Sequence, residues 1–400
     1  MTEQISSFQR MRLTNRAKVL NQIRLKQPIS RAVIAKETQL TPATVTNIVQ
    51  DLLEEKMIKE GENGSSQGGR KPILLSIDDR SKYIIGIDIG AFEVRMAITN
   101  LQAVIIRKKD LPLSAKLDNS LFLSYIEESI QNIIEESRLD KQAIVGIGIG
   151  MHGVVNAELG TAIFAPNFQL VDVPIKSYLE TKVQIPVYVE NDVRAFTLGE
   201  SWFGAGKGIN HFICVNVGVG IGAGIIYNGE LYRGSNHIAG EFGHTLIDIK
   251  GEKCSCGRIG CLETVASGKA LVEYVLQEKD NDYIMQQVNS SEQLTGELIF
   301  QCANQGDPCA IRILAKVGYF LGVGVTNLIN LINPECIIVG GGVAKAGGFV
   351  LEEMRRVVKD NALTNDARNT IIIESELKDE GTLIGAVTLV LNHIFFSNHK

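Results

Sequence analysis

The sequence has no run of about 18 apolar residues, and it has only seven cysteines in 400 residues. The first absence predicts that no helix spans a membrane. The polar start MTEQISSFQRMRLTNR lacks the apolar core of a signal peptide, which indicates a cytoplasmic protein. So few cysteines fit a reduced compartment better than a disulfide framework. With 45% apolar and 21% charged residues, the chain can form a sizeable core, and its length suggests two or three domains.

Charge is unevenly distributed along the chain. Residues 1–82 contain 14 lysines and arginines against 9 acidic residues, whereas residues 83–400 contain 26 against 36. A basic arm on an acidic body indicates that only the arm meets a polyanion such as DNA. An ordinary solvated helical face explains the charge alone equally well, so the pattern within the arm has to decide.

Three short helices are predicted in the first 55 residues. Apolar residues recur near helical spacing between Arg12 and Lys26. Ser30 is suited to cap a second helix, and Thr41 precedes Pro42 at the start of a third. Two short helices joined by a tight turn are typical of a helix-turn-helix, whose second helix reads DNA. The start of the third helix carries short polar side chains suited to base edges and phosphates: Thr41, Thr44, Thr46 and Asn47.

A β-hairpin is predicted in the stretch MIKEGENGSSQGGRKPILLSID, residues 57–78. Its glycine-rich tip is followed by Arg70 and Lys71, which are suited to a phosphate backbone or a minor groove. A winged helix that binds only protein is the less favoured alternative. Residues 1–82 are therefore predicted to form a winged helix-turn-helix DNA-binding domain.

The most specific pattern in the chain is H-x9-C-x-C-x4-C, formed by His244, Cys254, Cys256 and Cys261. Three thiolates and one imidazole complete the tetrahedral shell of Zn²⁺ and leave no open position for a metal-bound water. The pattern therefore predicts a structural zinc site, in preference to a redox role or a chance cluster of cysteines.

Several segments together resemble the signature of the ROK family over about residues 83–390. They are DIG at 88–90, END at 190–192, GEFGH at 240–244, the cysteine pattern, and VGGGVAKAG at 339–347. The winged helix with its closing GGRKP is similar to that of ROK repressors. The resemblance implies an α/β protein in which a two-lobed actin-like ATPase fold follows the winged helix. The first lobe would comprise residues 83–190 and the second residues 191–400, with the last helix returning to the first lobe.

The resemblance also implies a sugar site in a cleft between the lobes. ROK sugar kinases hold a hexose with residues that correspond here to Asn191, Asp192, Glu241, His244 and Glu263. Carboxylates and an amide suit vicinal hydroxyl groups, and His244 would face the sugar through one nitrogen while the other binds zinc. Asn167 in APNF is a further candidate. Asp192 stands where a glutamate is expected in xylose-responsive relatives, which weakens a xylose assignment without excluding it. The sequence does not identify the sugar among xylose, glucose and N-acetylglucosamine.

The phosphate-binding turns depart from the kinase pattern. Kinases that resemble this chain have D-x-G-G-T at the first turn, where this chain has Ala91, Phe92 and Glu93 after Gly90. At the second turn Val219 replaces a threonine of L-G-T-G-x-G. Phosphoryl transfer depends on positioning and charge stabilisation, so both changes argue against catalysis.

The favoured hypothesis is a sugar-responsive repressor of carbohydrate-utilisation genes that binds operator DNA as a homodimer or tetramer. It would have no catalytic residue and no membrane partner. The alternative is an ATP-dependent sugar kinase with an appended DNA-binding domain, in which Asp192 is the general base. A constitutive DNA-binding protein that cannot bind sugar is a third, less favoured hypothesis.

Overall fold

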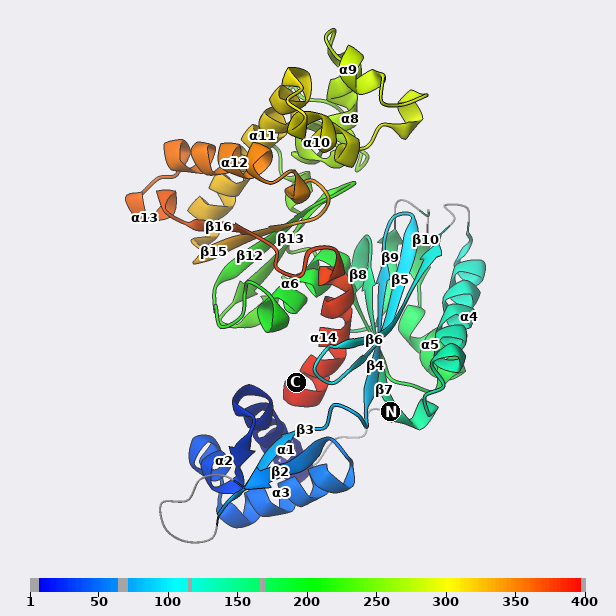
Figure 1. Cartoon of the computed structure of the whole chain (residues 1–400), viewed down its shortest axis with the longest axis vertical. Helices are drawn as coiled ribbons and strands as arrows, with labels where there is room; N and C mark the ends of the chain where they lie inside the picture. The colour runs from blue at the N-terminus through cyan, green and yellow to red at the C-terminus, as the bar shows by residue number, and fades with distance from the viewer. Residues whose placement is uncertain (1–6, 64–70, 114–116, 166–167, 169, 397–400) are drawn as a thin grey trace. The chain divides into compact units, whose positions relative to one another are not determined.

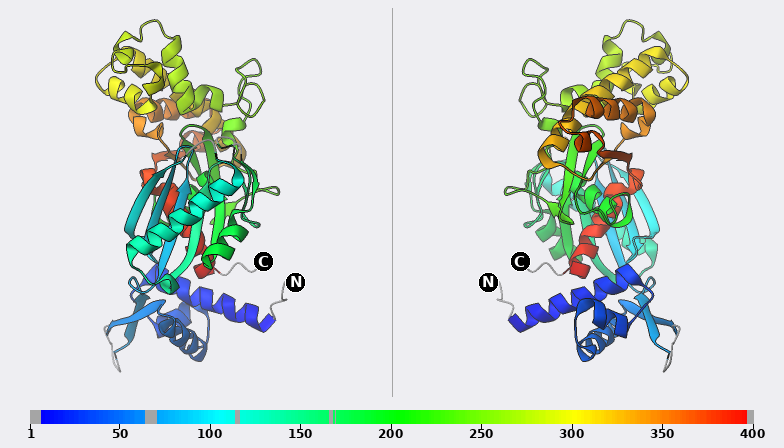
Figure 2. Two further views of the ribbon diagram at one scale, coloured as in Figure 1. Left: turned by 90° about the vertical axis from the view of Figure 1, so that its right-hand side faces the viewer. Right: turned by 90° about the vertical axis from the view of Figure 1, so that its left-hand side faces the viewer.

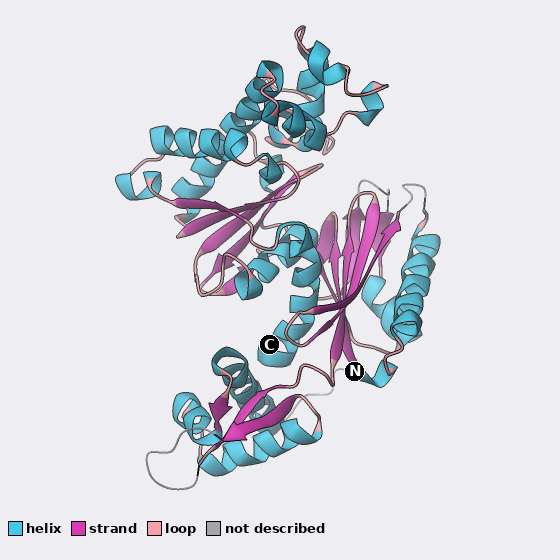
Figure 3. Ribbon diagram, in the orientation of Figure 1, coloured by secondary structure: helices cyan, strands magenta, loops and turns pink. Residues whose placement is uncertain are grey.

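The computed structural model describes residues 7–63, 71–113, 117–165, 168 and 170–396. Its described residues form two compact units. The first unit is drawn from residues 1–151, 155–190 and 386–400, and the second from residues 152–154 and 191–385. Figure 1 labels the helices and strands, and Figure 3 distinguishes them by colour.

The first unit begins with a small helical domain that carries a three-stranded sheet. Its elements are α1 Ser7–Lys26, β1 Ile29–Ser30, α2 Arg31–Thr38, α3 Pro42–Glu54, β2 Ile58–Asn63 and β3 Ile73–Ile77. As the sequence indicates, Ser30 caps α2 by accepting from the Val33 amide, and Thr41 caps α3 by accepting from the Thr44 amide. The strands pair in the order β1-β3-β2, which is the sheet of a winged helix. The helix α1 starts five residues before the predicted Arg12, because its polar first turn shows no hydrophobic periodicity.

A five-stranded sheet forms the rest of the first unit, in the order β11-β7-β4-β5-β6. Its elements are β4 Tyr83–Ile89, β5 Glu93–Asn100, β6 Ile105–Pro112, α4 Asn119–Ser137, η1 Lys141–Ala143, β7 Ile144–Met151 and β11 Val187–Asn191. Between β7 and β11 lie β8 Val154–Asn156, β9 Thr161–Ala165, β10 Leu170–Val173 and α5 Ile175–Val183. The strand β4 pairs antiparallel with β5 and parallel with β7. The helix α4 crosses one face of the sheet in Figure 2 and buries Phe122, Ile126 and Ile130 against it.

A second five-stranded sheet, in the order β14-β13-β12-β15-β16, organises the second unit. Its strands are β12 Phe212–Val217, β13 Ile221–Tyr227, β14 Glu230–Tyr232, β15 Cys336–Gly340 and β16 Ile371–Glu374. The helices before β15 are α6 Asp192–Phe203, η2 Phe242–His244, α7 Glu263–Ala266, α8 Gly268–Gln277, α9 Asp282–Met285, η3 Ser291–Gln293, α10 Gly296–Asn304 and α11 Pro308–Ile332. Those after it are η4 Ala344–Ala346, α12 Gly348–Asn361, α13 Asn365–Arg368, η5 Lys378–Glu380 and the start of α14 Gly381–Phe396, which belongs to the first unit from residue 386 onward.

Alternate residues of β12 face two hydrophobic layers of the second unit. Ile213, Val215 and Val217 pack with α11 and α12, whereas Phe212 and Cys214 pack with Phe196 of α6. The helix α11 is long and apolar enough to cross a membrane by length and composition alone. However, 61% of its most apolar window is buried inside the protein, so α11 is a core helix of this layer.

The two five-stranded sheets share one topology. In each, the first strand pairs antiparallel with the second and parallel with a later strand: β4 with β5 and β7, and β12 with β13 and β15. The turns after β4 and β12 therefore hold equivalent places in the two units. These are the turns in which the sequence replaces the kinase residues.

Candidate functional site

The four predicted zinc ligands come together in the second unit. The ligand atoms of His244, Cys254, Cys256 and Cys261 all lie within 4.8 Å of one another. The loop is held in shape by two backbone bridges, between Leu246 and Cys261 and between Lys253 and Ile259. Gly260 has a φ of 77° in this loop, and a Cβ there would lie 1.6 Å from the Asp248 carbonyl oxygen, so only glycine fits.

The ligand distances fit a tetrahedral ion. The Sγ atoms of Cys256 and Cys261 lie 3.7 Å apart, and His244 Nδ1 lies 3.6 Å from the Sγ of Cys254. Zinc with Zn–S bonds of about 2.3 Å requires thiolates about 3.8 Å apart. Although desolvation raises it, hydrogen bonds from Arg258 and from the other two thiols lower the pKa of Cys256 to about 6. The low pKa of Cys256 favours its thiolate, the form that binds a metal, so these four side chains could hold a metal ion.

Two of the predicted sugar-binding residues lie at the start of α6. Asn191 is the N-cap of this helix and accepts from the Arg194 amide, while its own amide donates to the Gly153 carbonyl, at 3.0 Å, and to Asp192. The Asp192 Oδ1 atom also accepts from the Val193 amide at 2.9 Å. The helix start thus fixes the orientation of both side chains.

Glu241 lies near the other two described candidates and near Asp192. Glu241 lies close enough to His244, Asp192 and Glu263 to interact with each electrostatically. The Oε2 atom of Glu263 accepts from the Ile221 amide at 3.2 Å, at the start of β13. Because His244 turns Nδ1 toward Cys254, its Nε2 atom is the nitrogen left for a ligand. Asn167, the sixth candidate, lies outside the described residues.

A histidine that the sequence analysis missed adjoins this group. His152 follows β7 directly, and its Nδ1 atom lies 3.3 Å from Asp192 Oδ2. Burial lowers the pKa of His152, but the hydrogen bond and charge of Asp192, with Glu263 and Glu241 nearby, raise it above its ordinary value overall. No spacing rule reveals this contact, because the two residues are 40 positions apart.

The candidate DNA-binding residues lie at the start of α3 and before β3. The Thr41 hydroxyl is 2.8 Å from that of Thr44 and caps the helix, and Thr46 donates to the Pro42 carbonyl at 2.9 Å. Asn47 is exposed, and its amide has no hydrogen-bond partner among the described residues. Lys71 is exposed beside β3, whereas Arg70 lies outside the part of the chain that the structure describes.

The turns that correspond to the kinase phosphate sites present apolar side chains to solvent. Phe92 is 68% exposed after β4, and Val219 is 50% exposed after β12. The buried Asp88, at the end of β4, forms an ion pair with Arg95 of β5, and Arg95 Nε also lies 3.6 Å from Glu93. Arg95 therefore lies next to Asp88, the acidic residue of the kinase pattern that this turn retains.

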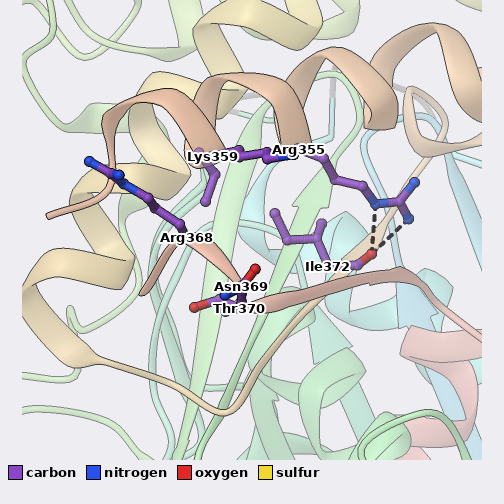
Figure 4. Close-up of a pocket in the computed structure, with 7 residues that line it drawn as sticks. Arg355, Lys359, Arg368, Asn369, Thr370 and Ile372 are labelled. Carbon is purple, nitrogen blue, oxygen red and sulfur yellow. Dashed lines mark hydrogen bonds between the residues drawn. The ribbon is translucent and has the colours of Figure 1, made fainter. Parts of the chain in front are cut away.

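A separate cavity of about 270 Å³ lies in the second unit, at the end of α12 (Figure 4). It shares no residue with the candidate site. Arg355 donates from Nε and Nη2 to the Ile372 carbonyl, and Arg368 donates to the Ala362 carbonyl just after α12. Lys359 lies in the last turn of this helix, where a cation complements the helix dipole. The two arginines thus bind backbone carbonyls and Lys359 complements the end of α12, so we assign no ligand to the cavity.

Comparison with known proteins relates the whole chain to sugar-responsive regulators. The chain is 35% identical over 382 residues to a putative xylose repressor of Caldicellulosiruptor sp. strain Rt8B.4, covering 94% of this chain and 95% of the relative. Its structure is similar to that of a ROK family transcriptional regulator described as a homologue of the E. coli MLC protein. That match has a TM-score of 0.84 and 26% identity, and covers 96% of this chain and 97% of the other.

The structure is also similar to those of sugar kinases, but this similarity covers only part of the chain. The ROK family glucokinase of Streptomyces griseus, solved with glucose and AMPPNP, has a TM-score of 0.69 and 31% identity, and covers 77% of this chain and 98% of its own. These likenesses confirm the predicted fold, a two-lobed ROK architecture that follows a DNA-binding type of N-terminal region. The family profile named ROK matches residues 84–393. The chain therefore belongs to the ROK family.

Proposed function

We propose that this protein is a sugar-responsive transcriptional repressor of carbohydrate-utilisation genes, located in the cytoplasm. The observation that carries the proposal is the presence, in one chain, of a winged helix with an exposed Asn47 and a group of carboxylates near a His/Cys cluster that could hold a metal ion. The likeness to a xylose repressor over 94% of the chain supports it. Residues 1–82 would bind operator DNA, and residues 83–400 would form the two lobes that sense the sugar.

The proposed sugar contacts are Asp192, Glu241, Glu263, Asn191 and Nε2 of His244, with Asn167 as a sixth. The carboxylates accept hydrogen bonds from sugar hydroxyl groups. A bound Zn²⁺ would hold His244 in one orientation, so that Nε2 faces the ligand. D-xylose is the first sugar to test because a relative is named for it, and D-glucose and N-acetyl-D-glucosamine follow.

Operator binding requires two recognition helices, so we propose a homodimer or tetramer. A dimer must place its two α3 helices about 34 Å apart to reach successive major grooves. Sugar binding would change operator affinity by about 5- to 150-fold, the range of a coupling free energy of about 1–3 kcal/mol.

We propose further that the protein is not an enzyme. The exposed Phe92 and Val219 offer no hydrogen-bond donor to a phosphate, and Arg95 is paired with Asp88, where a metal–nucleotide complex would need a free carboxylate. The competing function is a sugar kinase, which the likeness to a glucokinase and the presence of Asp192 favour.

The deciding experiment combines selection of an operator from random DNA with a sugar titration and a kinase assay. The repressor requires sequence-specific DNA binding whose affinity changes with one sugar, without release of ADP from ATP. If that sugar binds but operator affinity stays constant at every concentration, the proposal is wrong. Sugar-dependent ADP release that disappears in Asp192→Asn would instead establish the kinase.

A further inference from the structure

His152 and Asp192 form a partly buried pair at the candidate sugar site. The two side chains are 25% and 18% exposed, and Nδ1 of the imidazole lies 3.3 Å from Oδ2 of the carboxylate. Asp192 begins α6, whereas His152 lies between β7 and β8. The imidazole therefore reaches the carboxylate from a different element, on the oxygen that the helix start leaves uncovered.

The hydrogen bonds around Asp192 divide between its two oxygens. The Oδ1 atom accepts from Asn191 Nδ2, at 2.7 Å, and from the Val193 amide, at 2.9 Å. The Oδ2 atom receives His152. With both oxygens engaged, the carboxylate is held in one orientation. Its remaining acceptor capacity can meet a sugar hydroxyl group in a fixed direction.

Acidic groups predominate around the imidazole. The charged groups that raise the pKa of His152 are Asp192 at the start of α6, Glu263 at the start of α7, and Glu241 just before η2. All three are carboxylates, which when ionised only accept hydrogen bonds. A sugar hydroxyl group donates once, and its oxygen then needs a donor from the protein. A charged imidazole supplies such a donor at Nε2, because both of its nitrogens carry a proton.

We propose that His152 is an effector-binding residue of the candidate sugar site. In its charged form it would hold Asp192 through Nδ1 and donate from Nε2 to a hydroxyl oxygen of a neutral sugar, so that effector affinity falls as the pH rises. This inference rests on the proposed sugar-binding function. The direction of the pH effect follows from the raised pKa of His152: the favourable charged form is present at low pH and is lost as the pH rises through that pKa.

The test is calorimetric titration of the zinc-loaded, full-length protein between pH 5.5 and 8.5. The probe is whichever of D-xylose, D-glucose and N-acetyl-D-glucosamine binds most tightly. We expect proton uptake on binding and an affinity that falls by up to about tenfold per pH unit above the pKa of His152, as one linked proton requires. In His152→Gln the affinity should be lower at pH 6 and independent of pH.

His211→Gln is the matched control, because the His211 ring contacts Tyr227 and the Asn228 amide elsewhere in the same unit. This variant should keep the pH dependence of the wild type. A pH-independent wild-type affinity, or a pH dependence that persists in His152→Gln, would overturn the role of His152 while leaving the repressor function intact. If none of the three sugars binds at any pH, the inference and the sugar-responsive function fail together.

A second measurement does not depend on how the variant folds. The imidazole signals of wild-type His152 can be followed by NMR during a pH titration, with and without sugar. We expect sugar to move the midpoint upward, since binding favours the charged form. An unchanged or lower midpoint with saturating sugar would contradict the proposed donor at Nε2.

Discussion

Asp88 and Arg95 are directly opposite each other on the antiparallel strands β4 and β5, and their side chains form an ion pair. Asp88 is 3% exposed and Arg95 is 24% exposed, so the pair is largely removed from water. The turn between these strands is the one in which Phe92 replaces the threonine of the kinase pattern. The pair thus joins the two strands beside the turn whose sequence departs from the kinase pattern.

Removal of the cation alone should destabilise the first unit. We expect Arg95→Ala to lower the free energy of unfolding by about 3 kcal/mol, because it removes the cation that pairs with the buried Asp88 charge. Arg107→Ala of β6 is the control, since its pair with Glu136 is exposed to solvent and should contribute much less to stability. Urea denaturation measures the free energy of unfolding of both variants. Equal losses would show that the Asp88–Arg95 pair stabilises the protein no more than an exposed pair does.

Two residues of α3 should affect DNA binding for different reasons. Thr41→Ala removes the hydroxyl that caps α3, so it should lower stability by about 1 kcal/mol and weaken operator binding as well. Asn47→Ala should leave the unfolding transition unchanged and weaken binding to the selected operator by about 1–3 kcal/mol, as expected for loss of a base contact. Thermal unfolding and fluorescence anisotropy distinguish the two effects. An Asn47→Ala protein with unchanged affinity would remove this residue from the interface.

The zinc site should be required for the folded state of its loop. Cys261→Ser should lose the metal and lower the unfolding temperature, because the remaining three ligands no longer complete the coordination shell. Ser255→Ala changes an exposed, non-ligand position of the same loop and should keep about one equivalent of zinc per chain. Elemental analysis measures the zinc content of each variant, and thermal unfolding measures its stability. Wild-type protein that contains no zinc after expression in zinc-supplemented medium would contradict the assignment.

Asp192→Asn should separate sugar binding from DNA binding. The amide cannot accept at both atoms, so sugar affinity should fall at least tenfold, while operator affinity without sugar should stay unchanged. Asp282→Asn changes another carboxylate at the first position of a helix, outside the candidate site, and should affect neither. Calorimetry and anisotropy report the two affinities. Loss of operator binding in Asp192→Asn would mean that the residue acts on the fold instead.

Helix caps and metal-ligand clusters could be predicted from the sequence, because each depends on a few residue types at a characteristic spacing. Ser30 and Thr41 were recognisable as helix caps, and the spacing of the cysteines predicted a cluster that the fold brings together. The Asp88–Arg95 pair was not predicted, because strand register depends on the length of the turn between β4 and β5. The contact of His152 with Asp192 depends on tertiary folding alone, since no local pattern connects these two segments.

The buried environment of helix α6 restricts which substitutions can be tolerated at its start, where Asn191 and Asp192 lie. Nine of its twelve residues are buried, including Arg194 and Glu200. The Glu200 carboxylate accepts hydrogen bonds from the Ala205 and Leu377 amides, so the far end of the helix is fixed as well. A mutation that changes the side-chain orientation of Asn191 or Asp192 by moving the helix would disturb these buried contacts. Relatives that acquire a new ligand are therefore expected to change loop positions such as that of His152, and to inherit the helix almost intact.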